Sequence, residues 1–190
     1  FEPSVEGTTC YTAEEFSAEK TTNCNSIDLL PKFIPNKIAW RYTQIGTQYT
    51  VGKNLETKTL YGWGESGSGI DTHMMKNIEW GAVAYLTHSS YGINRALEIT
   101  DNANYLTGGG AANAYITNVE QSTTGNIYGI YDMAGGSYEY VMGNFNDVNA
   151  SSGITPVNIP NKYIDRYLNT SYSDGNYGDA VYETSSSGTN

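Results

Sequence analysis

The side chains of this sequence best suited to acid–base or metal chemistry are His73, Glu79, His88 and Glu139. Two glutamates could form a glycosidase pair, in which one carboxyl protonates the leaving group and the other attacks or activates water. Each histidine could bind a metal. On one helix, however, the two histidines would stand about 22 Å apart and could not share an ion. We interpret the histidines as structural or surface residues and the glutamates as scaffold residues.

Cys10 and Cys24 are the two cysteines of the chain. A disulfide between them would close a loop of about 15 residues and contribute about 3 kcal/mol of stability. The alternative is two unrelated thiols in a reducing compartment. A metal site built on these thiolates would need further Cys or His ligands, and none lies nearby in the sequence. We predict the disulfide, because the composition favours an oxidising compartment.

Other groups of oxygen-bearing side chains have spacings similar to those of metal loops. Residues 174–179 read Asp-Gly-Asn-Tyr-Gly-Asp but lack the terminal Glu of an EF-hand. Asn144, Asp147 and Asn149 form a second group. We interpret both groups as solvated turns. Asn149 and Asn169 also begin Asn-x-Ser glycosylation patterns, which matter only in a host that glycosylates.

The composition limits where the protein acts and what it binds. Charged residues make up only 16% of the chain, against about 25% in average domains, and Gly and Tyr supply 21 and 17 residues. The net charge of −10 argues against a nucleic-acid partner, because phosphates repel an acidic surface. No apolar run approaches the ~20 residues of a membrane helix. The composition therefore predicts an extracellular or cell-surface protein without membrane insertion in this segment.

The strongest secondary-structure signal predicts one long buried helix at about 72–89. Its apolar residues cover most of the helix circumference, which is typical of a helix in the centre of a domain. The residues on the expected core face are Met74, Ile78, Ala82 and Tyr85, and Gly92 follows as a stop signal. Residues 93–124 and 144–180 are rich in Gly, Asn and Ser and are predicted to form ligand-facing loops.

Residues 129–140 read Gly-Ile-Tyr-Asp-Met-Ala-Gly-Gly-Ser-Tyr-Glu-Tyr, and residues 77–84 read Asn-Ile-Glu-Trp-Gly-Ala-Val-Ala. Both segments resemble motifs of the formylglycine-generating-enzyme, or sulfatase-modifying-factor, family. The family patterns are approximately Gly-Leu-Tyr-Asp-Met-x-Gly-Asn-Val-Trp-Glu-Trp and, in the preceding helix, Glu-x-Glu-Trp-Glu-x-Ala-Ala. The sequence of this chain resembles most the prepilin-like bacterial surface proteins that carry such a domain. The matching scaffold positions are Glu79, Trp80, Tyr131, Asp132, Met133, Tyr138 and Glu139.

The resemblance implies an α+β, C-type-lectin-like fold, loop-rich, with small twisted antiparallel sheets and the long helix. It also implies a structural calcium site. In calcium-binding members of the family, four positions of the Asp-Met turn coordinate the ion, and these correspond to Asp132, Gly135, Ser137 and Glu139. Two carboxylates and two backbone carbonyls would supply the hard oxygens that Ca²⁺ prefers. The alternative is a structural turn whose carboxylates accept backbone N–H bonds.

Two departures from the family pattern argue against catalysis. The family's oxidases bind copper through paired cysteines in the C-terminal third, whereas this sequence has no Cys after Cys24. The family's closing Arg-Gly-Gly-aromatic strand does not occur before Asn190. The resemblance therefore implies the scaffold without the chemistry, and we expect no enzymatic activity.

We expect a single domain over 1–190, divided into a disulfide-tethered N-terminal loop region at 1–36 and a C-type-lectin-like core at 37–190. Phe1 corresponds to a position inside the family's opening strand, and Asn190 precedes its closing strand. We therefore expect an incomplete domain, truncated at both ends. Further residues, or neighbouring subunits through strand addition, would complete its sheet.

Together these observations predict a non-catalytic recognition or adhesion domain, displayed on a bacterial surface appendage or adhesin. Its partner would be a surface protein or glycan, and self-assembly with neighbouring subunits is a second expectation. Three alternatives stay open: a structural subunit of an extracellular filament or pilus, a phage receptor-binding protein, and an oxidase of the formylglycine-generating type.

Overall fold

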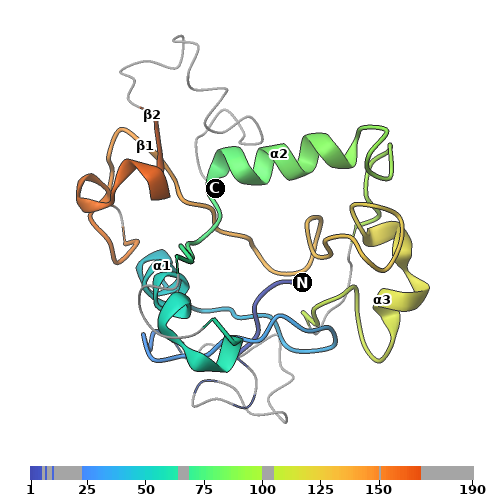
Figure 1. Ribbon diagram of the computed structural model, residues 1–190, viewed down its shortest axis with the longest axis horizontal. Helices are drawn as coiled ribbons and strands as arrows, with labels where there is room; N and C mark the ends of the chain where they lie inside the picture. Colours follow the sequence, from blue (N-terminus) through green and yellow to red (C-terminus); the bar gives the residue numbers. More distant parts are fainter. Residues whose placement is uncertain are drawn as a thin grey trace. The chain divides into compact units, whose positions relative to one another are not determined.

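The computed structural model describes residues 1–5, 7, 10, 23–63, 69–99, 105–149 and 151–167 of the chain. Within these residues the fold combines short helices with a small sheet, so it is of the mixed α+β kind (Figure 1). The α-helices are α1 (Ile45–Asn54), α2 (Asn77–Thr87) and α3 (Ala114–Thr117), and the strands are β1 (Gly143–Phe145) and β2 (Asp165–Tyr167). Five 3₁₀ turns complete the described elements: η1 (Leu55–Thr57), η2 (Thr59–Tyr61), η3 (Val119–Gln121), η4 (Pro156–Asn158) and η5 (Asn161–Tyr163).

The chain forms two compact units. The first combines Phe1–Thr43 with Gly81–Glu139, and the second combines Gln44–Trp80 with the segment that starts at Tyr140. The division falls inside α2, between Trp80 and Gly81. Each unit has its own buried apolar side chains. Those of the first unit include Val5, Ile38, Trp40, Leu106 and Tyr131, and those of the second include Val51, Leu55, Met142, Tyr163 and Ile164.

In the second unit, a close backbone approach determines how α1 begins. The N–H of Gly46 donates to the carbonyl of Ser152 at 2.7 Å. A Cβ atom at position 46 would lie 2.5 Å from the carbonyl oxygen of Gly153, so only glycine fits there without a shift of the chain. Further along α1, the side chain of Val51 is buried.

The two-stranded sheet is parallel, which corrects the expectation of antiparallel sheets. Gly143 pairs with Asp165, and Phe145 pairs with Tyr167. The physical reason is the connection between the strands, which contains η4 and η5 and is long enough for the crossover that parallel strands require. Among the described residues of the first unit, antiparallel pairing occurs as isolated bridges, namely Ser4–Lys32, Ser4–Ala39 and Ile38–Leu106.

The predicted helix at 72–89 is present as α2, but it is shorter than expected. The helix begins only at Asn77, because Lys76 forms a parallel β-bridge with Met142 and its backbone is therefore extended. The carboxylate of Glu79 then accepts the N–H of Lys76 at 2.8 Å, which satisfies a backbone donor before the first helical turn. The helix ends at Thr87, whose carbonyl accepts the N–H of Asn94 at 2.9 Å.

The prediction that this helix is buried is wrong. Gly81 and Thr87 are the buried residues of α2, whereas Ile78 and Tyr85 of the expected core face are exposed, as is Leu86 beside them. A helix that is apolar on all sides carries no signal for which side meets the core. In this chain the small residue Gly81 and the polar residue Thr87 are shielded, and the larger side chains of Ile78, Tyr85 and Leu86 are exposed.

The predicted disulfide between Cys10 and Cys24 is present, with the two Cα atoms 5.3 Å apart. Cys24 is buried, and its carbonyl accepts the indole N–H of Trp40 at 3.1 Å. The disulfide is compatible with an extracellular protein. None of the helices that the structure describes is long and apolar enough to cross a membrane.

Candidate functional site

The segment from Thr123 to Tyr138 contains the Tyr-Asp-Met motif and lies in the first unit. It starts as a closed loop, because the N–H of Thr123 donates to the carbonyl of Ile130 at 3.0 Å and the N–H of Ile130 donates to the Thr123 hydroxyl at 2.9 Å. Within the segment Tyr131 and Asp132 are buried. Tyr128 and Tyr138, on either side of them in sequence, are 88% and 97% exposed. The motif therefore anchors the segment and leaves two tyrosines in solvent.

Asp132 is the polar anchor. Its carboxylate accepts the N–H of Gly108 at 2.9 and 3.0 Å and the N–H of Glu2 at 3.0 Å. Asp132 has a positive φ of 69°, a backbone conformation that Asp tolerates better than most residues. The buried charge is thus paired with backbone donors from two distant segments, in agreement with the structural alternative for this turn.

Tyr131 is the apolar anchor. Its ring stacks on Phe1 with a centroid distance of 5.2 Å, and Phe1 meets Tyr115 edge to face at 5.9 Å. The Tyr131 hydroxyl donates to the backbone carbonyl of Tyr115. These contacts hold the first residues of the chain against the motif and against α3, because Tyr115 belongs to that helix.

Glu2 is a functional candidate that the sequence reasoning missed. The Oε1 atom of Glu2 is buried without a hydrogen-bond partner. Burial, together with the nearby carboxylates of Asp132 and Glu139, raises the pKa of Glu2 to about 9. No motif includes Glu2, so the sequence holds no signal for this cluster.

We expect the stability of the protein to fall as the pH rises from about 5 to 9. In the unfolded chain Glu2 loses its proton near its ordinary pKa of 4.5, whereas the folded protein holds that proton up to about 9. The folded state therefore binds more protons in this window, and its advantage disappears as the pH increases. Glu2→Gln should flatten this dependence and raise the melting temperature at pH 8, as followed by circular dichroism.

The matched control is Glu98→Gln, at an exposed glutamate of the same unit. It should leave the slope of melting temperature against pH as in the unmodified chain. An equal flattening in both variants would contradict the assignment of this dependence to Glu2.

The four predicted calcium-binding positions differ in their surroundings. Asp132 is buried and hydrogen-bonded, Gly135 has a φ of 84°, and Glu139 is exposed. The Ser137 hydroxyl is buried without a hydrogen-bond partner. Across the part of the chain that the structure describes, no group of three or more Asp, Glu, His or Cys side chains is arranged to hold a metal ion. Calcium at this turn stays a prediction.

The other candidate residues lie in separate places. His73 Nε2 is 3.2 Å from the carboxylate of Glu79, and His88 is an exposed residue just beyond α2. Glu79 belongs to the second unit and Glu139 belongs to the first. Of the remaining scaffold residues, Trp80 and Met133 are partly exposed.

Among the solvated-turn candidates, the side-chain amide of Asn144 donates to the carbonyl of Val148 at 2.9 Å, and the Asp147 carboxylate lies 3.5 Å from the Arg166 guanidinium. Residues 174–179 and Asn169 lie outside the described residues.

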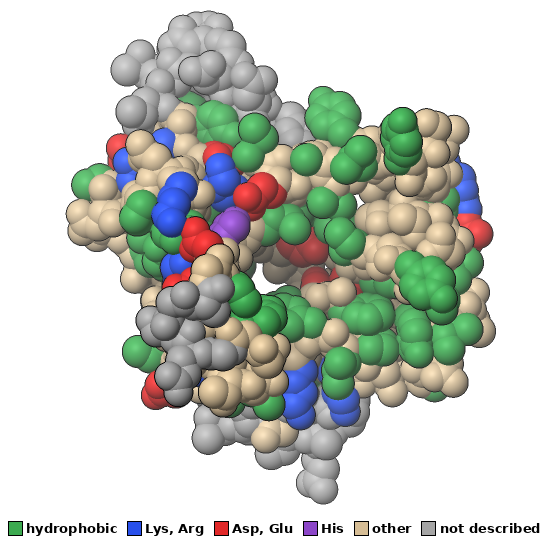
Figure 2. Space-filling model, in the orientation of Figure 1, with side chains coloured by type: hydrophobic (Ala, Val, Ile, Leu, Met, Phe, Trp, Pro, Cys, Tyr) green, Lys and Arg blue, Asp and Glu red, His purple; other side chains and the backbone are tan. Residues whose placement is uncertain are grey.

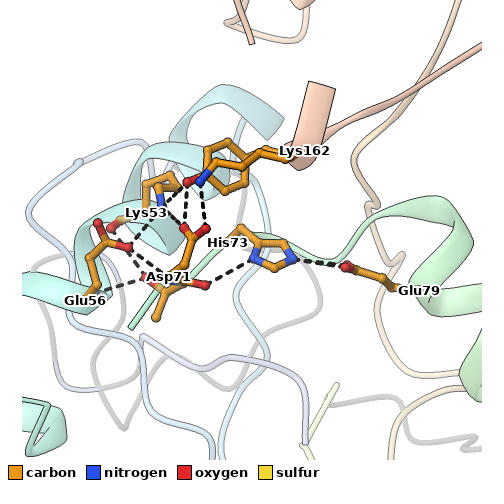
Figure 3. A network of polar contacts seen from close by, with 8 residues as sticks. Lys53, Glu56, Asp71, His73, Glu79 and Lys162 are labelled. Carbon is orange, nitrogen blue, oxygen red and sulfur yellow. Dashed lines mark hydrogen bonds and ion pairs between the residues drawn. The ribbon is translucent and has the colours of Figure 1, made fainter. Parts of the chain in front are cut away.

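The second unit contains a network of charges that no motif predicts (Figure 3). Asp71 accepts hydrogen bonds from Lys162 Nζ at 2.8 Å, Lys53 Nζ at 2.7 Å and the Tyr163 hydroxyl at 2.6 Å. These donors hold the pKa of Asp71 well below its usual range. Lys53 also reaches Glu56 at 3.0 Å. Because Asp71 and Glu56 pair with the lysines, we interpret the network as a link between α1, the segment before α2 and η5.

Comparison with known proteins gives no relative. No protein-family model matches the chain, and no curated protein and no solved structure is significantly similar to it.

Proposed function

We propose that this chain is a non-catalytic, extracellular recognition domain, displayed on a bacterial surface appendage or adhesin, with a C-type-lectin-like scaffold similar to that of the formylglycine-generating-enzyme family. The observation that carries the proposal is the exposure of Tyr128 and Tyr138 on a segment anchored by Tyr131 and Asp132. Tyrosines presented from an anchored segment supply contact area at a low cost in side-chain entropy, which is why recognition surfaces use them.

The charge of this segment supports a recognition role. From Gln121 to Tyr138 the one charged residue is Asp132, and its side chain is buried. The exposed part of the segment is therefore neutral on a chain with a net charge of −10. A neutral surface of Tyr, Asn, Ser and Thr groups can approach a partner of either sign without the desolvation cost of charged groups. The disulfide is compatible with the proposed extracellular location.

The proposal is tested by binding the fluorescently labelled chain to immobilised oligosaccharides, mucin, collagen and fibronectin. We expect binding to at least one of these probes. Tyr128→Ala and Tyr138→Ala should each weaken it at least about tenfold, because exposed aromatic side chains commonly dominate binding energy. The matched control is Tyr91→Ala, which removes a ring that is 86% exposed and outside the segment. Absence of binding to every probe, or equal losses in all three variants, would overturn the proposal.

We also propose that Ca²⁺ binds at the turn of Asp132, Gly135, Ser137 and Glu139. Support comes from Ser137 Oγ, a buried oxygen of this turn without a hydrogen-bond partner, since oxygen donors are the ligands that calcium prefers. Millimolar Ca²⁺ should then raise the melting temperature relative to EDTA, because a ligand of the folded state stabilises it.

Ser137→Ala and Glu139→Gln should reduce this calcium response without unfolding the chain. Glu98→Gln, at an exposed residue outside the turn, should keep it. An identical melting curve of the unmodified chain in EDTA and in Ca²⁺ would leave the turn with its structural role alone.

A further inference from the structure

The loop from Thr123 to Ile130 exposes three large apolar side chains. Ile127, Tyr128 and Ile130 are 43%, 88% and 41% exposed. The two hydrogen bonds between Thr123 and Ile130 close the loop, so its backbone holds these side chains in a fixed arrangement. We call Ile127, Tyr128 and Ile130 the apolar patch of the loop.

The polar side chains of the loop are hydrogen-bonded to the loop itself. The Thr124 hydroxyl donates to Asn126 Oδ1 at 3.0 Å, and the same oxygen accepts the N–H of Tyr128 at 2.9 Å. Both acceptor sites of that oxygen are thereby used. The Asn126 amide donates to the carbonyl of Thr124 at 3.3 Å, and the hydroxyls of Ser122 and Thr124 lie 3.4 Å apart. A glycan offers many hydroxyls that must exchange their hydrogen bonds with water for new ones, and this loop has few to give.

The loop offers no charge to a partner either. Residues 121–131 contain no Asp, Glu, Lys or Arg. Figure 2 shows the surface around α3, where this loop lies, mainly in tan and green, the colours of uncharged groups. With charge absent and the polar side chains bonded within the loop, burial of the apolar patch is the largest favourable term that a partner can gain here.

Gly129 keeps the loop in this conformation. A Cβ atom at this position would clash with the hydroxyls of Ser122 and Thr124, so a larger residue would disturb the internal hydrogen bonds. The N–H of Gly129 donates to the carbonyl of Asn126 at 3.4 Å. A loop that is already ordered loses little conformational freedom when it binds, which favours affinity.

We infer that the apolar patch of this loop inserts into an apolar pocket on a partner protein. The inference rests on the proposed recognition function and names the class of partner. Rigid aromatic side chains seated in pockets are the usual anchors of protein interfaces. A glycan is a poorer match because of its hydroxyls, and an anionic lipid surface repels a chain with a net charge of −10.

The test measures binding of the labelled 190-residue chain to immobilised fibronectin and collagen, before and after enzymatic removal of their sugars, and to immobilised oligosaccharides. We expect binding to at least one of the two proteins, retained after the sugars are removed. Because the loop is neutral, this binding should change less than about twofold between about 0.05 and 0.5 M salt.

Two substitutions in the patch make the test specific. Ile127→Asn should weaken binding at least about tenfold, because the amide would lose its water inside an apolar pocket. Tyr128→Phe should keep the affinity within about twofold, since the ring and not the hydroxyl enters the pocket. The matched control is Ile99→Asn, at an isoleucine of the same unit that is 68% exposed and outside the loop, and it should bind as the unmodified chain does.

Binding that is confined to oligosaccharides, or that disappears with the sugars, would overturn this inference and leave the recognition role standing. Equal weakening by Ile127→Asn and Ile99→Asn, or a tenfold loss in Tyr128→Phe, would also overturn it. Absence of binding to every probe would remove the proposed function and this inference together. Circular dichroism of each variant, unchanged from that of the unmodified chain, shows that the fold is retained in the comparison.

Discussion

Asp132→Ala should destabilise the protein by at least about 3 kcal/mol, the largest effect that we expect from a single substitution. The alanine would leave the N–H groups of Glu2 and Gly108 without their acceptor, and a buried donor without a partner costs about 1–3 kcal/mol. It would also place a residue with a Cβ but no local hydrogen bond at a φ of 69°, which adds about 1–2 kcal/mol. Urea denaturation followed by tryptophan fluorescence measures the difference.

Asp132→Asn is the informative partner of that substitution. Asparagine has the same shape, tolerates a positive φ, and keeps one oxygen that can accept both backbone N–H groups at the position of Oδ2. We expect it to cost about 1 kcal/mol, the scale of one ordinary hydrogen bond. As a control for the loss of charge, Asp28→Ala at an exposed position should have almost no effect. Equal losses from Asp132→Ala and Asp28→Ala would contradict the anchoring role of Asp132.

Removing the disulfide through the double substitution Cys10→Ala, Cys24→Ala should cost about 3 kcal/mol, because the bond closes a loop of about 15 residues in the unfolded chain. For a chain of this length the loss corresponds to a fall of roughly 10 °C in melting temperature. Alanine is preferred to serine because Cys24 is buried, and a hydroxyl there would add a desolvation cost of its own.

Reduction of the unmodified protein gives an independent measure of the same contribution. Melting in the presence of a strong reductant should reproduce the behaviour of the double variant, and the reductant should leave that variant unchanged. Intact-mass measurement after alkylation should detect two thiols only after reduction. Two free thiols in the untreated protein would contradict the disulfide.

Local features of the sequence were sufficient to predict the disulfide and the place of one helix, whereas the α+β class was an implication of the family resemblance. A chain with two cysteines allows one intramolecular pairing, so no tertiary information is needed to choose Cys10 and Cys24. The apolar run around Trp80 predicts a helix because its spacing is local to the run. The start of that helix was misplaced, since the bridge between Lys76 and Met142 joins residues that are distant in sequence.

The tertiary structure alone decided which face of α2 is exposed and what Asp132 does. A helix with apolar residues on every side has no amphipathic period, so its sequence cannot indicate the side that meets the core. The motif marks Asp132 as important, but its partners Glu2 and Gly108 come from segments that the sequence does not relate to it. The charge network around Asp71 was missed for the same reason, because Lys53 and Lys162 lie far from it along the chain. Sequence patterns report local spacing, whereas the pairing of charged and polar groups depends on which distant segments the folded chain brings together.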